Sequence, residues 1–165
     1  MRYYQSEVGM INTPRSKCPI NRGVELLGDP WSLIILRDIA FCDYRTFREL
    51  LTRSGEGITP PTLSKRLADL VQTGMLTKEH VPRGKQGRYS LTERGIGVIP
   101  LLFELAAVGS MLDPTTESTV PQYAGLYGHP DLIAAFQQDL RDRHLGTTAR
   151  EEDEGKGAPA PGQGS

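Results

Sequence analysis

A group of hydroxyl-bearing and cationic side chains surrounds the proline pair Pro60-Pro61, near the middle of the chain. Hydroxyls at the N-terminal end of a helix suit contacts with phosphate, because free backbone N–H groups and the positive end of the helix dipole lie beside them. A lysine or arginine on the same helix can donate to a guanine edge in the major groove or to a phosphate. The residues that we expect to contact DNA here are Thr59, Thr62, Ser64, Lys65 and Arg66.

Further cations stand in the glycine-containing segment 82–88. Arg83, Lys85 and Arg88 are interspersed with Gly84 and Gly87. Flexible glycines let such side chains follow a phosphate backbone or enter a minor groove. A basic hairpin tip taken alone is more often only solvated. Its place beside a polar recognition helix, at the right offset along the chain, favours the DNA-binding interpretation.

Two helices joined by a short turn are predicted to position the first group. Asp43 can cap the first of them, which buries Phe47 and Leu50, and residues 54–57 form the turn. The second begins at Pro60, and its apolar residues recur with the helical spacings of four, three and four. Two strand candidates, 75–81 and 88–91, then flank the basic segment. This order predicts a helix-turn-helix followed by a two-stranded wing.

Helices are also predicted on both sides of this unit. Pro19 can start one that stops at Gly28, and Asp29 can cap the next, which carries Trp31 into the core. After the wing, Thr92 can cap a long helix from Glu93 to about Leu112. That helix is apolar on two sides, so it needs burial from two directions.

Composition divides the chain into four parts. We expect an N-terminal arm over 1–17, a winged-helix domain over 18–112, to which the resemblance described below adds dimerisation, an extension with a further helix over 113–145, and a disordered acidic tail over 146–165. The formal net charge of −1 hides an asymmetry. Residues 37–94 carry eleven basic and seven acidic side chains, whereas residues 95–165 carry four and ten. The near-neutral total therefore does not exclude a nucleic-acid partner.

Cys18 is the residue with the clearest redox chemistry. It stands where the first helix should begin, and a helix N-terminus with nearby cations such as Lys17 and Arg22 favours the reactive thiolate. The alternative is a small, half-buried capping residue with no redox role. Cys42 is predicted to be a small, buried hydrophobic side chain. The three histidines show no ligand-like spacing, so neither a metal site nor another cofactor is expected.

Several segments together resemble the HxlR-type family of winged-helix transcriptional regulators, relatives of the MarR group. They match over about residues 18–112, in the right order and spacing. The matching segments are Cys18-Pro19, 26–37, Phe47-Arg48-Glu49-Leu50, Gly57-Ile58-Thr59, 63–70, Gly74-Met75-Leu76 and 89–95.

The resemblance implies a mainly α-helical winged helix-turn-helix with a two-stranded wing, to which this chain adds a C-terminal helix. It implies a homodimer, formed by the N-terminal and post-wing helices, that binds double-stranded DNA at a pseudo-palindromic operator and mostly represses. Some members sense oxidants or electrophiles through a cysteine at the position of Cys18, so an oxidant or small-molecule effector is a further expectation.

No enzyme motif is found, and the start of the chain lacks the apolar stretch of a secretion signal. We therefore expect a cytoplasmic protein with no membrane partner and no catalytic activity. The alternative is a winged-helix module that binds protein or RNA. Such a module would bury an apolar wing or recognition face, whereas both faces here are polar and cationic.

Overall fold

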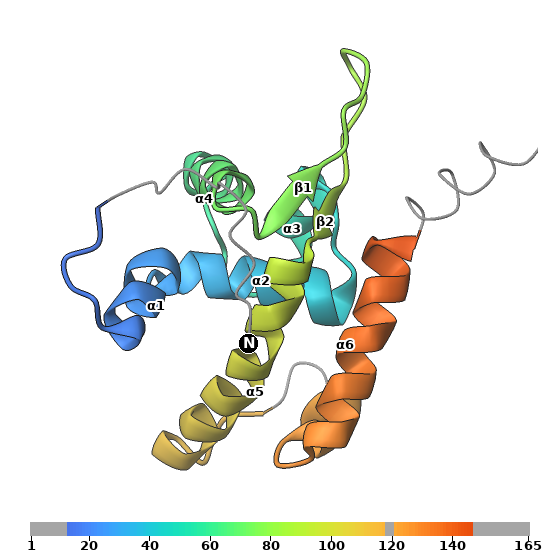
Figure 1. Ribbon diagram of the computed structural model, residues 1–165. Coiled ribbons are helices and arrows are strands. Elements are labelled where there is room, and N and C mark those ends of the chain that lie inside the picture. The colour runs from blue at the N-terminus through green and yellow to red at the C-terminus, as the bar shows by residue number, and fades with distance from the viewer. Residues whose placement is uncertain (1–12, 118–120, 147–165) are drawn as a thin grey trace, which may run out of the picture.

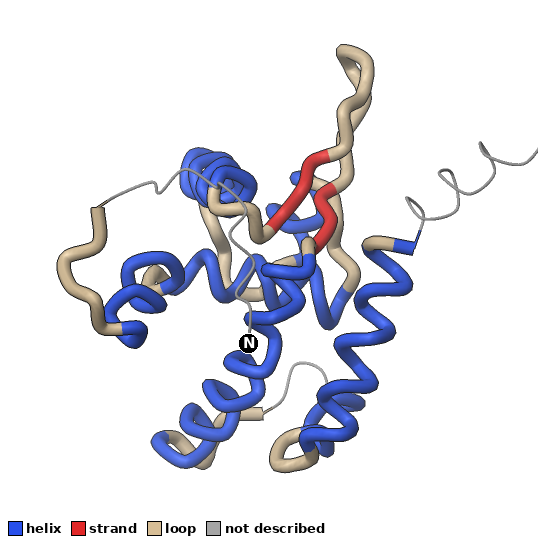
Figure 2. Tube along the Cα trace, viewed as in Figure 1, coloured by secondary structure: helices blue, strands red, loops and turns tan. Residues whose placement is uncertain are grey.

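The computed structural model describes residues 13–117 and 121–146. Over these ranges the chain forms six α-helices, one 3-10 helix and a two-stranded antiparallel sheet (Figures 1 and 2). The predicted fold class is confirmed. The elements are α1 (Pro19–Leu27), α2 (Pro30–Cys42), α3 (Phe47–Arg53), α4 (Pro60–Gln72), β1 (Leu76–Lys78), β2 (Tyr89–Leu91), α5 (Glu93–Leu112), η1 (Pro121–Leu126) and α6 (Pro130–His144). Residues 1–12 of the predicted arm and 147–165 of the predicted tail lie outside the described residues.

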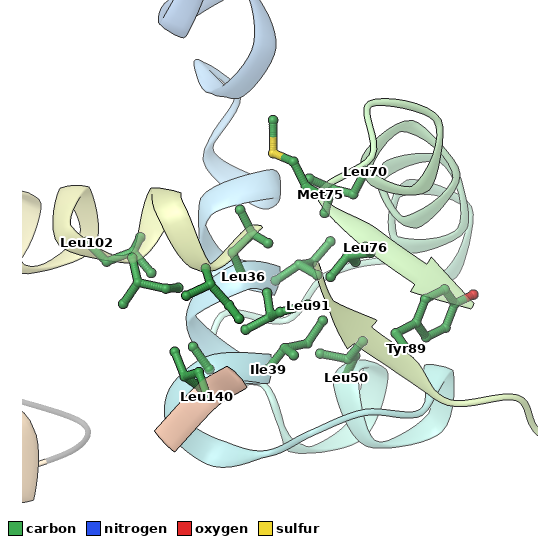
Figure 3. Close-up of a cluster of buried hydrophobic side chains, with 14 of the residues drawn as sticks. Leu36, Ile39, Leu50, Leu70, Met75, Leu76, Tyr89, Leu91, Leu102 and Leu140 are labelled. Carbon is green, nitrogen blue, oxygen red and sulfur yellow. The ribbon is translucent and has the colours of Figure 1, made fainter. Parts of the chain in front are cut away.

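The core forms around α2, which contacts α4, α5 and β2. Leu36 and Ile39 of α2 are fully buried, and Leu91 of β2 and Leu50 of α3 lie beside them (Figure 3). The predicted leucine stripe of α4 faces the same core, with Leu63, Leu67 and Leu70 at 2% exposure or less, while Val71 lies at its margin. Because one core holds α2, α3, α4 and the sheet together, the helix-turn-helix and the wing have a common base.

Helix caps confirm two predictions and correct a third. The Asp29 carboxylate accepts a hydrogen bond from the Ser32 N–H at 2.9 Å, and the Thr92 hydroxyl accepts one from the Gly95 N–H. Asp43 does not cap α3. It follows α2 in the left-handed conformation, with φ 53°, and Thr46 caps α3 instead. Thr46 prevails because Glu49 completes a capping box with it, which satisfies two helix donors at once.

The extension after α5 is folded against the winged-helix unit. Phe136 of α6 stacks on Phe41 of α2 with ring centroids 5.3 Å apart, and it also contacts Phe103 of α5 and Tyr123 of η1. Leu140 is fully buried one turn farther along α6. The predicted C-terminal helix is therefore part of the same core, as its position beside α5 and α2 shows (Figure 1).

Only one apolar side of α5 is covered within the described chain. Ile96, Ile99, Leu102 and Phe103 are buried. Five apolar side chains on its other surfaces are 42–75% exposed: Leu101, Leu105, Val108, Met111 and Leu112. Among the described helices, α5 alone is long and apolar enough to span a membrane by length and composition, a test that core helices of soluble proteins also pass. These five side chains are therefore the ones that remain to be covered if α5 is to be buried from a second direction, as the sequence predicts.

Candidate nucleic-acid interface

The N-terminal end of α4 presents the predicted hydroxyls to solvent. Thr59 is the N-cap residue in extended conformation, but its side chain makes no capping hydrogen bond. Its Oγ1 instead lies 2.8 Å from Oγ1 of Thr62. Pro60 and Pro61 occupy the first two helical positions and have no N–H to offer a phosphate. Any DNA contact at this end must therefore come mainly from the hydroxyls.

Ser64 and Lys65 continue this surface along α4. The Lys65 side chain is 67% exposed, and its Nζ lies 3.0 Å from Oδ2 of Asp69, one turn farther along the helix. An exposed pair of this kind contributes only about 0.3–0.5 kcal/mol, so the ammonium group can leave Asp69 for a base or a phosphate at little cost.

Arg66 is held differently from its neighbours. Its Nε lies 3.1 Å from Oδ1 of Asp29, the N-cap residue of α2, and its Nη1 lies 3.2 Å from Oδ2 of Asp69. The side chain is 30% exposed. Arg66 thus ties α4 to the start of α2. The predicted contact of this guanidinium with DNA would have to be made alongside these ion pairs or in place of them.

The turn before α4 is fixed by a network on α2. Arg37 donates to both carboxylate oxygens of Glu56, at 2.6 and 2.8 Å, and to Oδ1 of buried Asp38. The hydrogen bonds from Arg37 lower the pKa of Glu56 to about 2, whereas burial raises the pKa of Asp38. The turn before α4 is therefore tied to α2 by Arg37, and the middle of α4 is tied to the start of α2 by Asp29.

The wing is a projecting hairpin (Figure 1), and its cations lie in the segment that joins β1 to β2. Arg83 and Lys85 are exposed, and within the described ranges neither forms an ion pair. Gly84 has φ +91°, and a Cβ on Gly87 would lie 2.5 Å from the carbonyl oxygen of Glu79. Both glycines are thus needed for the shape of the hairpin. Arg88 lies nearer its base, with Nη2 3.9 Å from Oδ2 of Asp43.

Arg48 of α3 was missed as a candidate at the sequence level. It is exposed, and in the part of the chain that the structure describes its side chain forms no ion pair. In helix-turn-helix proteins the first helix crosses the DNA backbone, which suits a free cation at this position. An exposed basic residue on the first helix of the pair is the signal that could have identified it.

The two cysteines have different surroundings. Cys18 is exposed and forms the N-cap of α1, as predicted, without a side-chain capping bond. Cys42 is half-buried at the end of α2. Burial raises the pKa of its thiol, and the negative charge of Asp38 raises it further. Of the two thiols, Cys18 is the more accessible to an oxidant.

A cavity of about 690 Å³ lies between the segment before α1, α1 itself, the start of α2 and the middle and C-terminal part of α4. Its wall combines cations with carboxylates, among them Arg22, Glu25, Lys65 and Asp69. The cavity therefore touches side chains of the recognition helix itself. Over the described ranges, no group of three or more His, Cys, Asp or Glu side chains is placed to hold a metal ion.

A helix-turn-helix whose second helix presents polar and basic groups, next to a basic wing, defines a winged-helix DNA-binding protein. The family model of the HxlR-like helix-turn-helix matches residues 26–116, more than half of the chain. The protein belongs to this family, whose members are DNA-binding transcriptional regulators and not enzymes.

Curated proteins with similar sequences are also named as helix-turn-helix transcriptional regulators. The chain is 34% identical over 94 residues to an uncharacterized HTH-type transcriptional regulator of Synechocystis, with 56% of this chain and 68% of that protein covered. It is 36% identical over 101 residues to another uncharacterized HTH-type transcriptional regulator, from Mycobacterium bovis, with 59% and 61% covered. The second match thus spans less than two thirds of the relative's length.

Solved structures confirm the fold. PA1607, assigned provisionally as a transcription factor, superposes with a TM-score of 0.56 at 29% identity, over 64% of this chain and 73% of that one. A regulator from Porphyromonas gingivalis, assigned provisionally to the MarR family, superposes with a TM-score of 0.51 at 27% identity, over 59% and 95%.

Proposed function

We propose that the protein is a transcriptional repressor that binds a pseudo-palindromic operator as a homodimer. The N-terminal half of α4 enters the major groove, where Thr62, Ser64 and Lys65 contact bases and phosphates. The observation that supports this most strongly is the exposed hydroxyl and ammonium surface of α4 beside a projecting wing whose tip cations lack ion pairs. Arg48 adds a backbone contact from α3, and Arg66 keeps α4 in register with α2.

The dimer is proposed to form through α5 and α1. Leu101, Leu105, Val108 and Leu112 follow one another at spacings of four, three and four, the pattern of a helix-packing seam. Ile20 and Val24 of α1 are 77% and 57% exposed and supply further apolar surface. A two-fold axis through this interface would set the two recognition helices about one DNA turn apart.

The wing is proposed to bind phosphate without reading sequence. Lys85→Ala is expected to weaken binding to all DNA sequences alike and to reduce the slope of log affinity against log salt by about one. Titrations of operator and random-sequence duplexes over a range of salt concentrations measure both effects. Lys17→Ala, which removes another exposed lysine charge before α1, serves as the control. An unchanged slope in the Lys85 variant would remove Lys85 from the contact surface.

We propose Cys18 as the redox input. A disulfide-forming oxidant is expected to change the DNA affinity of the wild-type protein, and Cys18→Ser is expected to abolish that change, because Cys18 is the exposed thiol. DNA titrations before and after oxidation test this, with Cys42→Ser as the matched control. A response that survives in Cys18→Ser and disappears in Cys42→Ser would show that Cys42 is the sensor and that the proposal for Cys18 is wrong.

A small-molecule effector, if it uses the cavity beside α4, would act by direct competition. Lys65 belongs both to the cavity wall and to the proposed DNA surface. An occupant that pairs with Lys65 would lower DNA affinity, and bound DNA would lower the affinity for the occupant by the same factor.

A further inference from the structure

The outer edge of the wing's sheet is closed by groups from outside the wing. β2 pairs with β1 along one edge, with Leu91 opposite Leu76 and Tyr89 opposite Lys78. On the other edge, the Tyr89 N–H donates to the carbonyl of Arg45 at 2.7 Å, and the Leu91 N–H donates to Nδ1 of His144 at 3.1 Å. An imidazole from the last turn of α6 thus takes the place of a neighbouring strand.

The surroundings of His144 suit this acceptor role. The side chain is 8% exposed. Burial lowers the pKa of His144 to about 4, and the positive charges of Arg45, Arg143 and Arg88 act in the same direction with smaller effects. The ring is therefore neutral near pH 7, and because Nδ1 accepts the bond from Leu91, the ring hydrogen resides on Nε2.

His144 is held in place by the rest of α6. Gln137 donates to the carbonyl of Ile96 on α5 at 2.9 Å, and Nε of Arg141 lies 3.0 Å from Oε1 of Glu93. Together with buried Leu140 and the stack of Phe136 on Phe41, these contacts fix α6 on α2 and α5. The position of the imidazole is thus set by the body of the domain and not by the wing.

The wing's sheet is small, so the hydrogen bonds at its outer edge add to the support that buried Leu76 and Leu91 already give it. Each strand has three residues, and a two-stranded hairpin alone is marginally stable in water. The cations that we assign to DNA binding lie at the far end of this hairpin. Motion at the base of the hairpin therefore displaces Arg83 and Lys85.

We propose that α6 is a brace for the wing and that His144 is its positioning residue, so that a segment beyond the family match at residue 116 forms part of the DNA-binding apparatus. The proposal rests on the proposed function only in its assumption that the wing tip contacts DNA.

Two substitutions at His144 separate the hydrogen bond from simple packing. Asn places an amide oxygen close to where Nδ1 lies and preserves the acceptor, whereas Leu keeps the bulk and removes it. In the full-length His144→Leu variant, hydrogen exchange at the Leu91 amide is expected to accelerate about tenfold or more, and affinity for a random-sequence DNA duplex is expected to fall several-fold. His144→Asn is expected to restore both to within about twofold of wild type.

Removal of both wing-tip cations, by Arg83→Ala with Lys85→Ala, identifies the route of the effect. If the brace acts through the wing tip, adding His144→Leu to that double variant lowers its DNA affinity no further. Equal behaviour of the Asn and Leu variants, or faster Leu91 exchange with unchanged DNA affinity while Lys85→Ala does weaken binding, would overturn the proposal. If Lys85→Ala has no effect, the proposed wing contact fails instead, and Leu91 exchange still tests the hydrogen bond. Should the Leu variant not fold, His144→Gln, whose acceptor lies one bond farther out, replaces it.

Discussion

Leu105→Asp is expected to convert the proposed dimer into folded monomers and to lower affinity for the proposed operator by about a hundredfold or more, from the range of specific towards that of non-specific binding. Leu105 is 43% exposed on the uncovered side of α5, within the proposed seam. A two-fold interface contains each substitution twice, and burying an unpaired carboxylate costs several kcal/mol. The folded protomer should tolerate the change because this side chain is not part of its core.

Sedimentation gives the mass, far-ultraviolet circular dichroism the helix content, and titration with operator DNA the affinity. Leu132→Asp on α6 is the matched control, since Leu132 is 49% exposed and also lies on a helix. It should leave both the mass and the affinity unchanged. A Leu105→Asp protein that remains dimeric would place the interface elsewhere, as would a Leu132→Asp protein that dissociates.

Lys65→Ala is expected to reduce specific binding by about 1–3 kcal/mol, a factor of roughly 5 to 150, and to relax the preference at one position of each half-site. The lysine is 67% exposed and its pair with Asp69 is readily exchanged. If the lysine contacts a base, its removal reduces the protein's discrimination between bases at that position. If it contacts only phosphate, its removal weakens binding to all sequences alike.

Competition titrations with operator and single-base variants of it distinguish these outcomes. Lys17→Ala removes the same charge outside the proposed surface and should change neither quantity. If Lys65→Ala retained wild-type affinity and wild-type discrimination, the assignment of α4 as the recognition helix would be wrong.

Local patterns in the sequence were sufficient for much of the fold. The leucines of α4, the caps Asp29 and Thr92, and the glycines of the wing each depend on neighbours within a few residues, and all of them lie where expected. Asp43 shows the limit of such reasoning, because two residues with capping ability stood close together. The reciprocal bonds between Thr46 and Glu49 decided between them.

The remaining features depend on contacts between distant segments. Nothing near Arg66 in the sequence indicates that Asp29 will lie 3.1 Å from its Nε. His144 meets the Leu91 N–H across 53 residues, and Arg37 meets Glu56 across 19. Each of these partners is chosen by the way in which whole helices pack. The residue types at the candidate interface were therefore predictable, but which cations are exposed and which are tied to the core was not.

The most direct test of a sequence-specific, dimeric DNA-binding protein is selection of duplexes from a random DNA pool by the purified full-length chain, followed by footprinting of the enriched sites. We expect a two-fold symmetric consensus whose two protected half-sites lie about one helical turn, roughly 10 base pairs, apart. Failure to enrich any DNA sequence, or enrichment of a single site without two-fold symmetry, would contradict the account.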